Sequence, residues 1–235
     1  GNDQYDFSVM ADNTYPEGSL QTAWQTAASM FDELSYRSWQ KRGDVHTKAM
    51  EKLRSLINVV SHGGNFLLNI GPKGDGSVVP FEREVLKEIG IWLKKNGEAI
   101  YGTEASPFRE QFEWGTITRK GNNLYLILSG NRPADDKITL NIPGCKLQKA
   151  DIKAIQKGQE MIFTLPADAY GKDIQVICAT FDQPVKPQPI AAQRTPNYSY
   201  SCFDYYSNYR STVSYQWSIN KSNLNALEFT YTPQE

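Results

Sequence analysis

The segment Gly63-Gly64-Asn65-Phe66-Leu67-Leu68-Asn69-Ile70-Gly71 decides the fold, because it is a short apolar run with glycines at both ends. Its length and composition are typical of a β-strand that is buried on both faces of a parallel sheet. Apolar residues recur at helical spacing before it, over residues 45–61, and after it, over residues 81–96. The order helix, strand, glycine-rich loop, helix predicts the end of a repeating β/α architecture.

Residues 1–40 have a different character, since they are rich in aromatic and acidic residues and show little periodicity. We predict a long functional loop region there. A strand as apolar as residues 66–70 needs parallel neighbours on both edges, yet the upstream sequence does not offer several further β/α units. A complete (β/α)8 barrel takes about 250 residues, so residues 1–103 can hold only part of one.

After Thr103 the apolar residues alternate with polar ones, a pattern that predicts β-strands. Six strands are expected, at residues 112–117, 123–128, 137–142, 152–155, 161–165 and 174–179. The predicted fold class is therefore α/β plus all-β. It divides into terminal units of a (β/α)8-type barrel in residues 1–103, an antiparallel β-sandwich in 104–182, a Pro-rich linker in 183–196, and a β-rich tail or the start of a further β-module in 197–235.

Charge and composition exclude several functional classes. Lys and Arg number 25 against 26 Asp and Glu, so the chain has no basic field that would hold a nucleic acid. The apolar windows are far shorter than the roughly 20 residues of a membrane span, and no signal-peptide pattern opens the sequence. Two His and three widely spaced Cys provide neither a zinc ligand set nor a disulfide framework. We therefore expect no cofactor, no metal, no nucleic-acid partner and no membrane span.

Four motifs follow one another in the middle of the first region: Ser61-His62-Gly63-Gly64-Asn65-Phe66-Leu67-Leu68-Asn69-Ile70-Gly71-Pro72, Asp75-Gly76, Ile89-Gly90-Ile91-Trp92-Leu93 and Asn96-Gly97-Glu98-Ala99-Ile100-Tyr101-Gly102-Thr103. Their order and length resemble the α-L-fucosidases of glycoside hydrolase family 29. The resemblance covers roughly residues 1–180 and is strongest over 59–103. It implies a catalytic barrel followed by a β-sandwich, and a retaining exo-glycosidase that releases terminal α-L-fucose from fucosylated glycans. It also implies a periplasmic or secreted location.

The same resemblance locates the catalytic groups. The family's nucleophilic Asp lies upstream of everything that aligns, so we expect an N-terminal catalytic segment to be a missing partner of this chain. The acid/base carboxylate corresponds to about residues 1–20, where two registers compete. Asp6 opens a stretch similar to the Glu-Trp-Ser-Val of one subfamily, whereas counting back from Trp24 reaches Ala11, beside Asp12. Asp6 and Asp12 are therefore the candidate catalytic residues, turn-forming Asp residues are the alternative, and Ala11 leaves a pseudo-enzyme open.

Aromatic and basic residues of the first region are candidates for sugar binding. Trp24, Tyr36 and Trp39 could form the apolar platform on which a deoxysugar stacks, and Arg37 could clamp a ring hydroxyl. Core packing is the alternative for the tryptophans, and an ion pair with a nearby carboxylate is the alternative for Arg37. The rival function is a non-catalytic carbohydrate-binding or scaffold module that uses the sandwich and the Tyr-rich tail.

Overall fold

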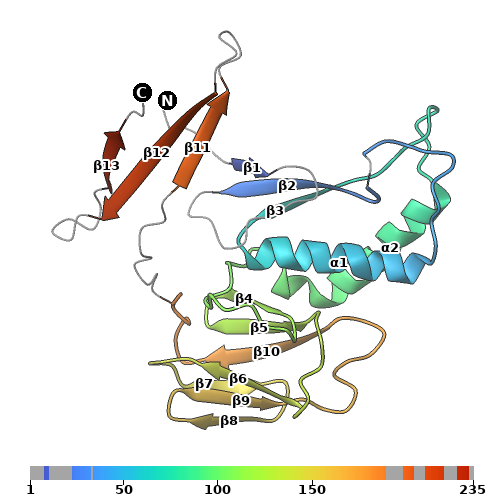
Figure 1. Ribbon diagram of the computed structural model, residues 1–235. Coiled ribbons are helices and arrows are strands. Elements are labelled where there is room, and N and C mark those ends of the chain that lie inside the picture. Colours follow the sequence, from blue (N-terminus) through green and yellow to red (C-terminus); the bar gives the residue numbers. More distant parts are fainter. Residues whose placement is uncertain are drawn as a thin grey trace. The chain divides into compact units, whose positions relative to one another are not determined.

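The computed structural model describes residues 8–10, 23–32 and 34–188, together with the backbone of three strands at 198–203, 210–219 and 227–232. The chain divides into two compact units, Gly1–Gln188 and Pro189–Glu235. Figure 1 traces the helices and strands of each unit. The finer domain boundaries expected from the sequence remain predictions.

The first unit begins with a three-stranded parallel sheet in the order β1-β2-β3. Its strands are β1 (Ser8–Met10), β2 (Trp24–Ser29) and β3 (Asn65–Asn69). The strand predicted from the apolar run is confirmed as β3, and β2 is its parallel neighbour. Among the described strands, β3 pairs with β2 alone, so its other edge has no partner there.

The prediction that residues 1–40 form a long loop is wrong where β1 and β2 lie. The sequence of β2 is Trp-Gln-Thr-Ala-Ala-Ser, and alanine and serine have little preference for strands. Its conformation is supplied by pairing, because five of its residues are in register with β3. A strand whose conformation depends on pairing with a neighbouring strand is hard to predict from its own residues.

The parallel sheet has one covered face and one open face. Trp24, Thr26 and Ala28 alternate along β2, so they share one face of the sheet, and all three are buried. Helix α1 runs along the sheet (Figure 1). The opposite face carries Val9 of β1 and Leu67 of β3, which are 59% and 52% exposed. The burial of β3 on both faces that its apolar sequence predicts is therefore not found within this chain.

Two helices cover the buried face and match the helical patterns of the sequence. They are α1 (Val45–Ser61) and α2 (Pro80–Asn96), and a short 3₁₀ turn, η1 (Gly97–Ala99), follows α2. Leu53 and Ile57 of α1 pack with Val85 and Ile89 of α2 in one hydrophobic cluster. In the part of the chain that the structure describes, no helix is both long and apolar enough to cross a bilayer.

Asp44 is the N-cap of α1, and its carboxylate accepts hydrogen bonds from the backbone N–H and the hydroxyl of Thr47. These bonds lower the pKa of Asp44 below its ordinary value. A carboxyl whose pKa falls on folding stabilises the protein above its unfolded-state pKa, and that stabilisation is lost as the pH falls through the folded-state pKa.

We expect Asp44→Ala to be less stable than the wild type at neutral pH, and the difference to shrink as the pH falls below the ordinary Asp pKa of about 3.9. Urea denaturation at a series of pH values measures both. A stability difference that does not change with pH would contradict this assignment of the cap.

Two antiparallel sheets complete the first unit. One has the strand order β4 (Thr116–Lys120), β5 (Asn123–Leu128), β10 (Gln175–Phe181), β7 (Leu147–Ala150), and the other has the order β6 (Lys137–Asn141), β9 (Glu160–Thr164), β8 (Ala154–Lys157). Ile117 and Leu126 of the first sheet share a core with Leu140 and Phe163 of the second. Together they form the antiparallel, sheet-rich part that the sequence predicts.

Two of the six strand predictions in this part need correction. The strand expected at residues 112–117 begins only at Thr116, because a turn closes between Phe112 and Gly115. The strand expected at 152–155 is shifted to Ala154–Lys157, and β7 was not predicted at all. In β7 the two central residues, Gln148 and Lys149, are both exposed, so the strand shows no apolar alternation.

The continuous apolar run of β5 reflects burial on both faces. Leu124, Leu126 and Leu128 face the core between the two antiparallel sheets. Tyr125 and Ile127 face the opposite way and join the hydrophobic cluster of the helices. The first antiparallel sheet is thus packed between the second sheet and the helix pair.

The second unit is an antiparallel sheet of three strands in the order β11-β12-β13. They are β11 (Tyr198–Phe203), β12 (Arg210–Ile219) and β13 (Leu227–Thr232). The sequence also predicts two strands in the tail, at residues 212–217 and 226–231. The first lies within β12, which extends two residues further at each end, and the second is shifted by one residue relative to β13.

Candidate functional site

The candidate site lies at one edge of the parallel sheet. The three strands run in the same direction and end at Met10, Ser29 and Asn69. The loops that leave this edge after β2 and β3 are described over residues 30–32, 34–44 and 70–79. In parallel α/β folds, ligands bind at the carboxyl ends of the strands because the variable loops gather there.

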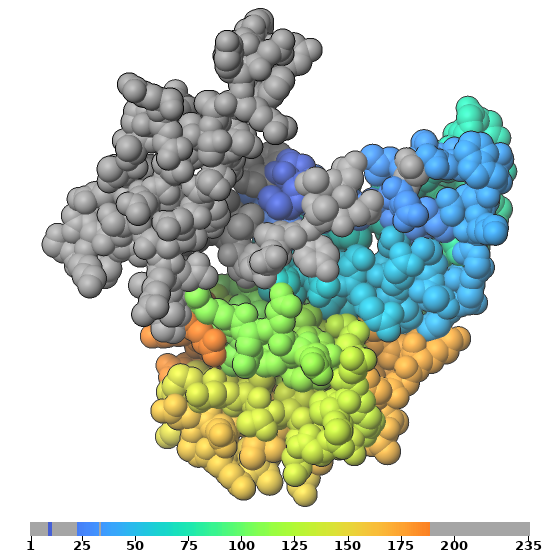
Figure 2. All heavy atoms as spheres, viewed as in Figure 1, coloured from blue at the N-terminus to red at the C-terminus, as the bar shows by residue number. Residues whose placement is uncertain are grey.

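These two loops are bound to each other, and Figure 2 shows them side by side on the surface. The side-chain amide of Asn69 donates to the carbonyl of Leu34. Gly71 lies so close to the other loop that a Cβ atom at this position would come within 3.0 Å of the Tyr36 nitrogen. Gly71 N–H in turn donates to the buried carboxylate of Glu82 over 2.9 Å. The arrangement fixes the position of the 34–43 loop.

The 34–43 loop is also closed by its own hydrogen bonds. The carbonyl of Arg37 accepts from Gln40 N–H at 3.2 Å and from Arg42 Nη2 at 3.1 Å. Arg42 Nη1 donates to the Gln40 carbonyl at 3.1 Å. A loop held in one conformation before it meets a ligand loses less entropy on binding.

Three of the four predicted sugar-binding residues lie together in this loop. Trp39 is 76% exposed and Tyr36 is 37% exposed. The Arg37 guanidinium lies over the Trp39 ring, 5.9 Å from its centroid, in a cation–π contact. The structure therefore brings an exposed aromatic face and a cationic group to the carboxyl edge of the sheet.

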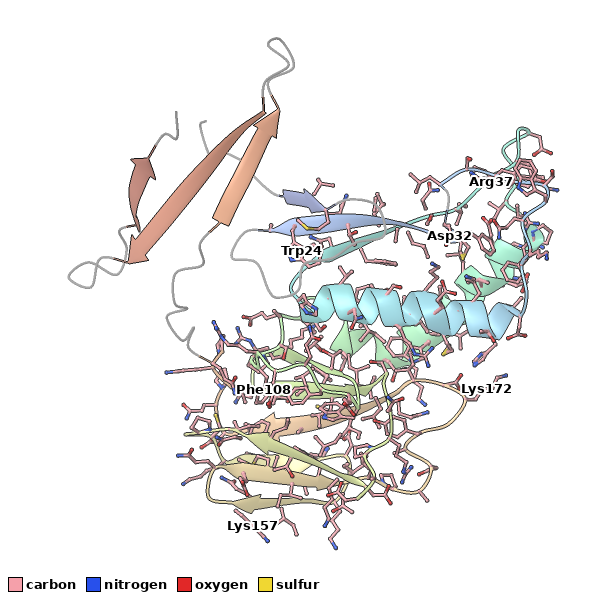
Figure 3. The ribbon with its side chains drawn as sticks, in the orientation of Figure 1. Trp24, Asp32, Arg37, Phe108, Lys157 and Lys172 are labelled. Carbon is pink, nitrogen blue, oxygen red and sulfur yellow. The ribbon has the colours of Figure 1, made fainter. Side chains whose placement is uncertain are left out.

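The fourth predicted residue, Trp24, lies at the other end of β2, far from Arg37 (Figure 3). It is fully buried, and its Nε1–H donates to the His62 carbonyl over 3.3 Å. The backbone of Gly64 lies against its ring, where a Cβ atom would approach to 2.4 Å. No ring face of Trp24 is exposed to a ligand, so the candidate site does not include it.

The two candidate catalytic residues, Asp6 and Asp12, lie outside the described residues. Retaining glycoside hydrolysis needs a carboxylic acid whose pKa is raised. Among the described carboxylates, those with a clear pKa shift all have it lowered, namely Asp44, Glu51, Asp75 and Glu84. In the loop beside Trp39, for example, hydrogen bonds from Ser77 lower the pKa of Asp75. None of these four is suited to act as the general acid.

Away from this edge, at a place that the sequence did not indicate, a cavity of about 320 Å³ lies between α1, α2 and the segment that leads into β10. His46 Nδ1 lies 2.9 Å from Glu88 Oε2, and its Nε2 lies 3.1 Å from the Lys172 carbonyl. These partners are 42 and 126 residues away in sequence, so no local sequence motif predicts the contacts. His46 connects the helices to the antiparallel sheets. The described residues contain no group of three or more side chains that could hold a metal ion.

Comparison with known proteins identifies the part of the chain that forms this edge. Residues 1–98 match the family model for alpha-L-fucosidase. Human tissue alpha-L-fucosidase is 40% identical over 122 residues, which are 49% of this chain and 25% of that protein. The resemblance to the α-L-fucosidases is confirmed. Human plasma alpha-L-fucosidase is 32% identical over 162 residues, which are 66% of this chain and 34% of that protein. The chain thus spans between a quarter and about a third of the length of these fucosidases.

The fold also resembles part of a fucosidase. A family 29 alpha-L-fucosidase from Bacteroides thetaiotaomicron superposes with a TM-score of 0.65 at 23% identity, covering 76% of this chain and 43% of that one. At this identity the likeness concerns the fold alone. It extends over parallel and antiparallel sheets together, since 76% of the chain is more than the first 98 residues.

Proposed function

We propose that this chain forms the last units of an α-L-fucosidase (β/α)8 barrel and the β-sandwich that follows it, and that it takes part in releasing terminal α-L-fucose from glycans with retention of configuration. The open parallel sheet is the observation that carries this proposal. One face of the sheet exposes Val9 and Leu67, and β3 has a single strand neighbour among the described residues.

A sheet with an unpaired edge and an exposed apolar face is expected to pack against further polypeptide. Unpaired strand edges and exposed apolar faces are unfavourable in water, and a closed barrel removes both because each strand gains two neighbours and the inner face is filled by side chains. We propose that the partner is polypeptide that carries further β/α units and the nucleophilic Asp. Family resemblance supports this assignment, and it also supports a periplasmic or secreted location.

Each proposed group has a defined part in the reaction. The nucleophile attacks the anomeric carbon while an acid protonates the leaving oxygen, and water then hydrolyses the glycosyl-enzyme intermediate. Asp6 and Asp12 are the proposed acid/base candidates. Tyr36 and Trp39 would stack on the C–H face of the sugar, and Arg37 would donate hydrogen bonds to its hydroxyls.

The isolated chain is expected to bind a fucoside without hydrolysing it. An aryl α-L-fucoside should release no aryl alcohol above the uncatalysed rate, because the nucleophile is absent. Methyl α-L-fucoside should cause saturable NMR shifts in residues 34–43 and 70–79, and methyl α-D-glucoside serves as the control. Trp39→Ala should abolish these shifts and leave the rest of the spectrum unchanged.

Turnover by the chain alone would refute the placement of the nucleophile. Fucoside-dependent shifts confined to residues 104–188 would instead support the rival function, a non-catalytic carbohydrate-binding module. Substituting Asp6→Asn and Asp12→Asn separately in the complete enzyme tests the acid/base assignment, since unchanged rates in both would exclude it.

A further inference from the structure

Glu82 is a buried carboxylate that has no part in the proposed reaction. It lies in the first turn of α2, and only 3% of it is exposed. An acidic residue in this position usually faces solvent, where it complements the helix dipole, or reaches back to the N-cap residue. Glu82 instead accepts a buried hydrogen bond over 2.9 Å from the N–H of Gly71, eleven residues earlier in the chain. The side chain is therefore directed at the loop that follows β3.

Burial makes this hydrogen bond strong. A carboxylate taken out of water loses its hydration, and hydrogen bonds from the protein have to replace it. A bond from a backbone N–H to a carboxylate is stronger than a bond between neutral groups, and the low dielectric of the interior strengthens it further. Glu82 can therefore hold Gly71 more firmly than an exposed side chain could.

The first turn of α2 is itself well anchored. Pro80 occupies the start of the helix, where its fixed φ favours helical geometry. The ring of Phe81 stacks on Phe31, with 6.1 Å between the ring centroids. Phe31 belongs to the segment that leaves β2, whereas Gly71 belongs to the segment that leaves β3. One helical turn thus contacts the chain after both strands.

Gly71 transmits this constraint to the loop that carries Tyr36 and Trp39. A Cβ atom on Gly71 would lie 3.0 Å from the Tyr36 nitrogen, 3.1 Å from Tyr36 Cα and 3.2 Å from the carbonyl carbon of Ser35. All three are backbone atoms, so the two loops are in direct backbone contact. A shift of Gly71 therefore has to shift the backbone of Tyr36.

We propose that Glu82 is a positioning residue of the sugar site, because its bond to Gly71 holds the 34–43 loop in the conformation that presents Tyr36 and Trp39 to the fucoside. The inference rests on the proposed function, since it assumes that these two aromatic rings stack on the sugar. Glu82 acts through Gly71 and touches no substrate. When only a fraction of molecules has the competent loop conformation, the apparent dissociation constant equals the intrinsic one divided by that fraction.

Glu82→Leu tests the inference, because leucine keeps an apolar side chain of similar size in place but cannot accept the Gly71 hydrogen bond. If about one molecule in ten then has the competent loop, the dissociation constant for methyl α-L-fucoside rises about tenfold. NMR titration of residues 34–43 measures it. Glu82→Gln keeps a carbonyl oxygen that can accept from Gly71 N–H, so its dissociation constant should stay within about twofold of the wild type.

A second measurement needs no ligand. The N–H of Gln40 donates to the Arg37 carbonyl over 3.2 Å and so reports on the closed conformation of the loop. Its hydrogen exchange should be faster in Glu82→Leu than in the wild type and unchanged in Glu82→Gln.

Two controls come from the same helix. Glu84→Leu removes an equal charge from the surface, where Glu84 pairs with Lys87 at 2.9 Å, and should leave the dissociation constant unchanged. Val85→Ala opens a cavity in the helix cluster, since Val85 is fully buried there, and so lowers stability without touching Gly71. It should leave fucoside binding unchanged under conditions in which urea unfolding curves show each variant to be folded.

The outcomes separate this inference from the proposed function. Unchanged binding in Glu82→Leu, or an equal loss in Val85→Ala, would overturn the positioning role and leave the proposed function intact. A wild-type chain that does not bind the fucoside would overturn both. Should Glu82→Leu not fold, Gly71→Ala tests the same link, because its methyl group pushes against Tyr36 while Glu82 remains. Weaker binding in Gly71→Ala would support the inference, and wild-type binding would overturn it.

Discussion

Trp24→Ala is expected to lower the free energy of unfolding by about 3–5 kcal/mol, the usual cost of truncating a large buried aromatic side chain. Trp24 is fully buried on the covered face of the parallel sheet and packs against the backbone of Gly64. Its removal leaves a cavity and also leaves the His62 carbonyl without its indole donor.

Trp39→Ala is the matched control, because it deletes the same side chain from a position that is 76% exposed. We expect it to change the free energy of unfolding by less than about 0.5 kcal/mol. Urea denaturation followed by far-UV circular dichroism measures both variants. Comparable losses in the two would show that the tryptophans do not differ as their burial indicates.

The second large effect is expected for Gly115→Ala, in the turn that leads into β4. Gly115 has φ of +150°, and a Cβ atom there would lie 2.0 Å from the Ile127 carbonyl oxygen and 2.9 Å from Ser129 N. Both neighbours are backbone atoms and cannot rotate away. We expect a loss of about 3 kcal/mol or more in the free energy of unfolding, since β4 and β5 must separate to accept the methyl group.

Gly90→Ala is the control for this substitution. Gly90 lies in the interior of α2, and apart from the backbone of its own helix and its chain neighbours nothing lies within 4 Å of the position that a Cβ would take. Alanine is favoured over glycine in a helix, so this variant should gain about 0.5–1 kcal/mol. The two glycine variants thus have opposite expected signs in the same denaturation experiment. A gain or no change in Gly115→Ala would show that the turn adapts to a side chain.

The elements that local sequence specifies strongly were predictable. The helix patterns of α1 and α2 are regular because one face of each helix packs in a single cluster. The strand β3 is recognisable because its apolar run stands between glycines. Strand β2 is different, since its small residues acquire strand conformation from their register with β3.

The candidate site was predictable in composition but not in geometry. Sequence placed Trp24 and Trp39 in the same group of aromatic residues, and the tertiary structure separates them completely. The cation–π contact between Arg37 and Trp39 depends on a loop closed by Arg42 and positioned by Gly71. Residue types alone do not define that loop conformation.

By itself, the sequence determined that the chain contains a β/α region followed by antiparallel strands, because periodicities of 3.6 and 2 are local properties of a chain. It also determined the likeness to the fucosidases, because that likeness consists of matching motifs in the same order along the chain. Only the tertiary structure decided which face of the parallel sheet is covered, which tryptophan is buried and how the loop that carries Trp39 is held. These depend on contacts between residues far apart in the chain, and such contacts form only when the elements pack.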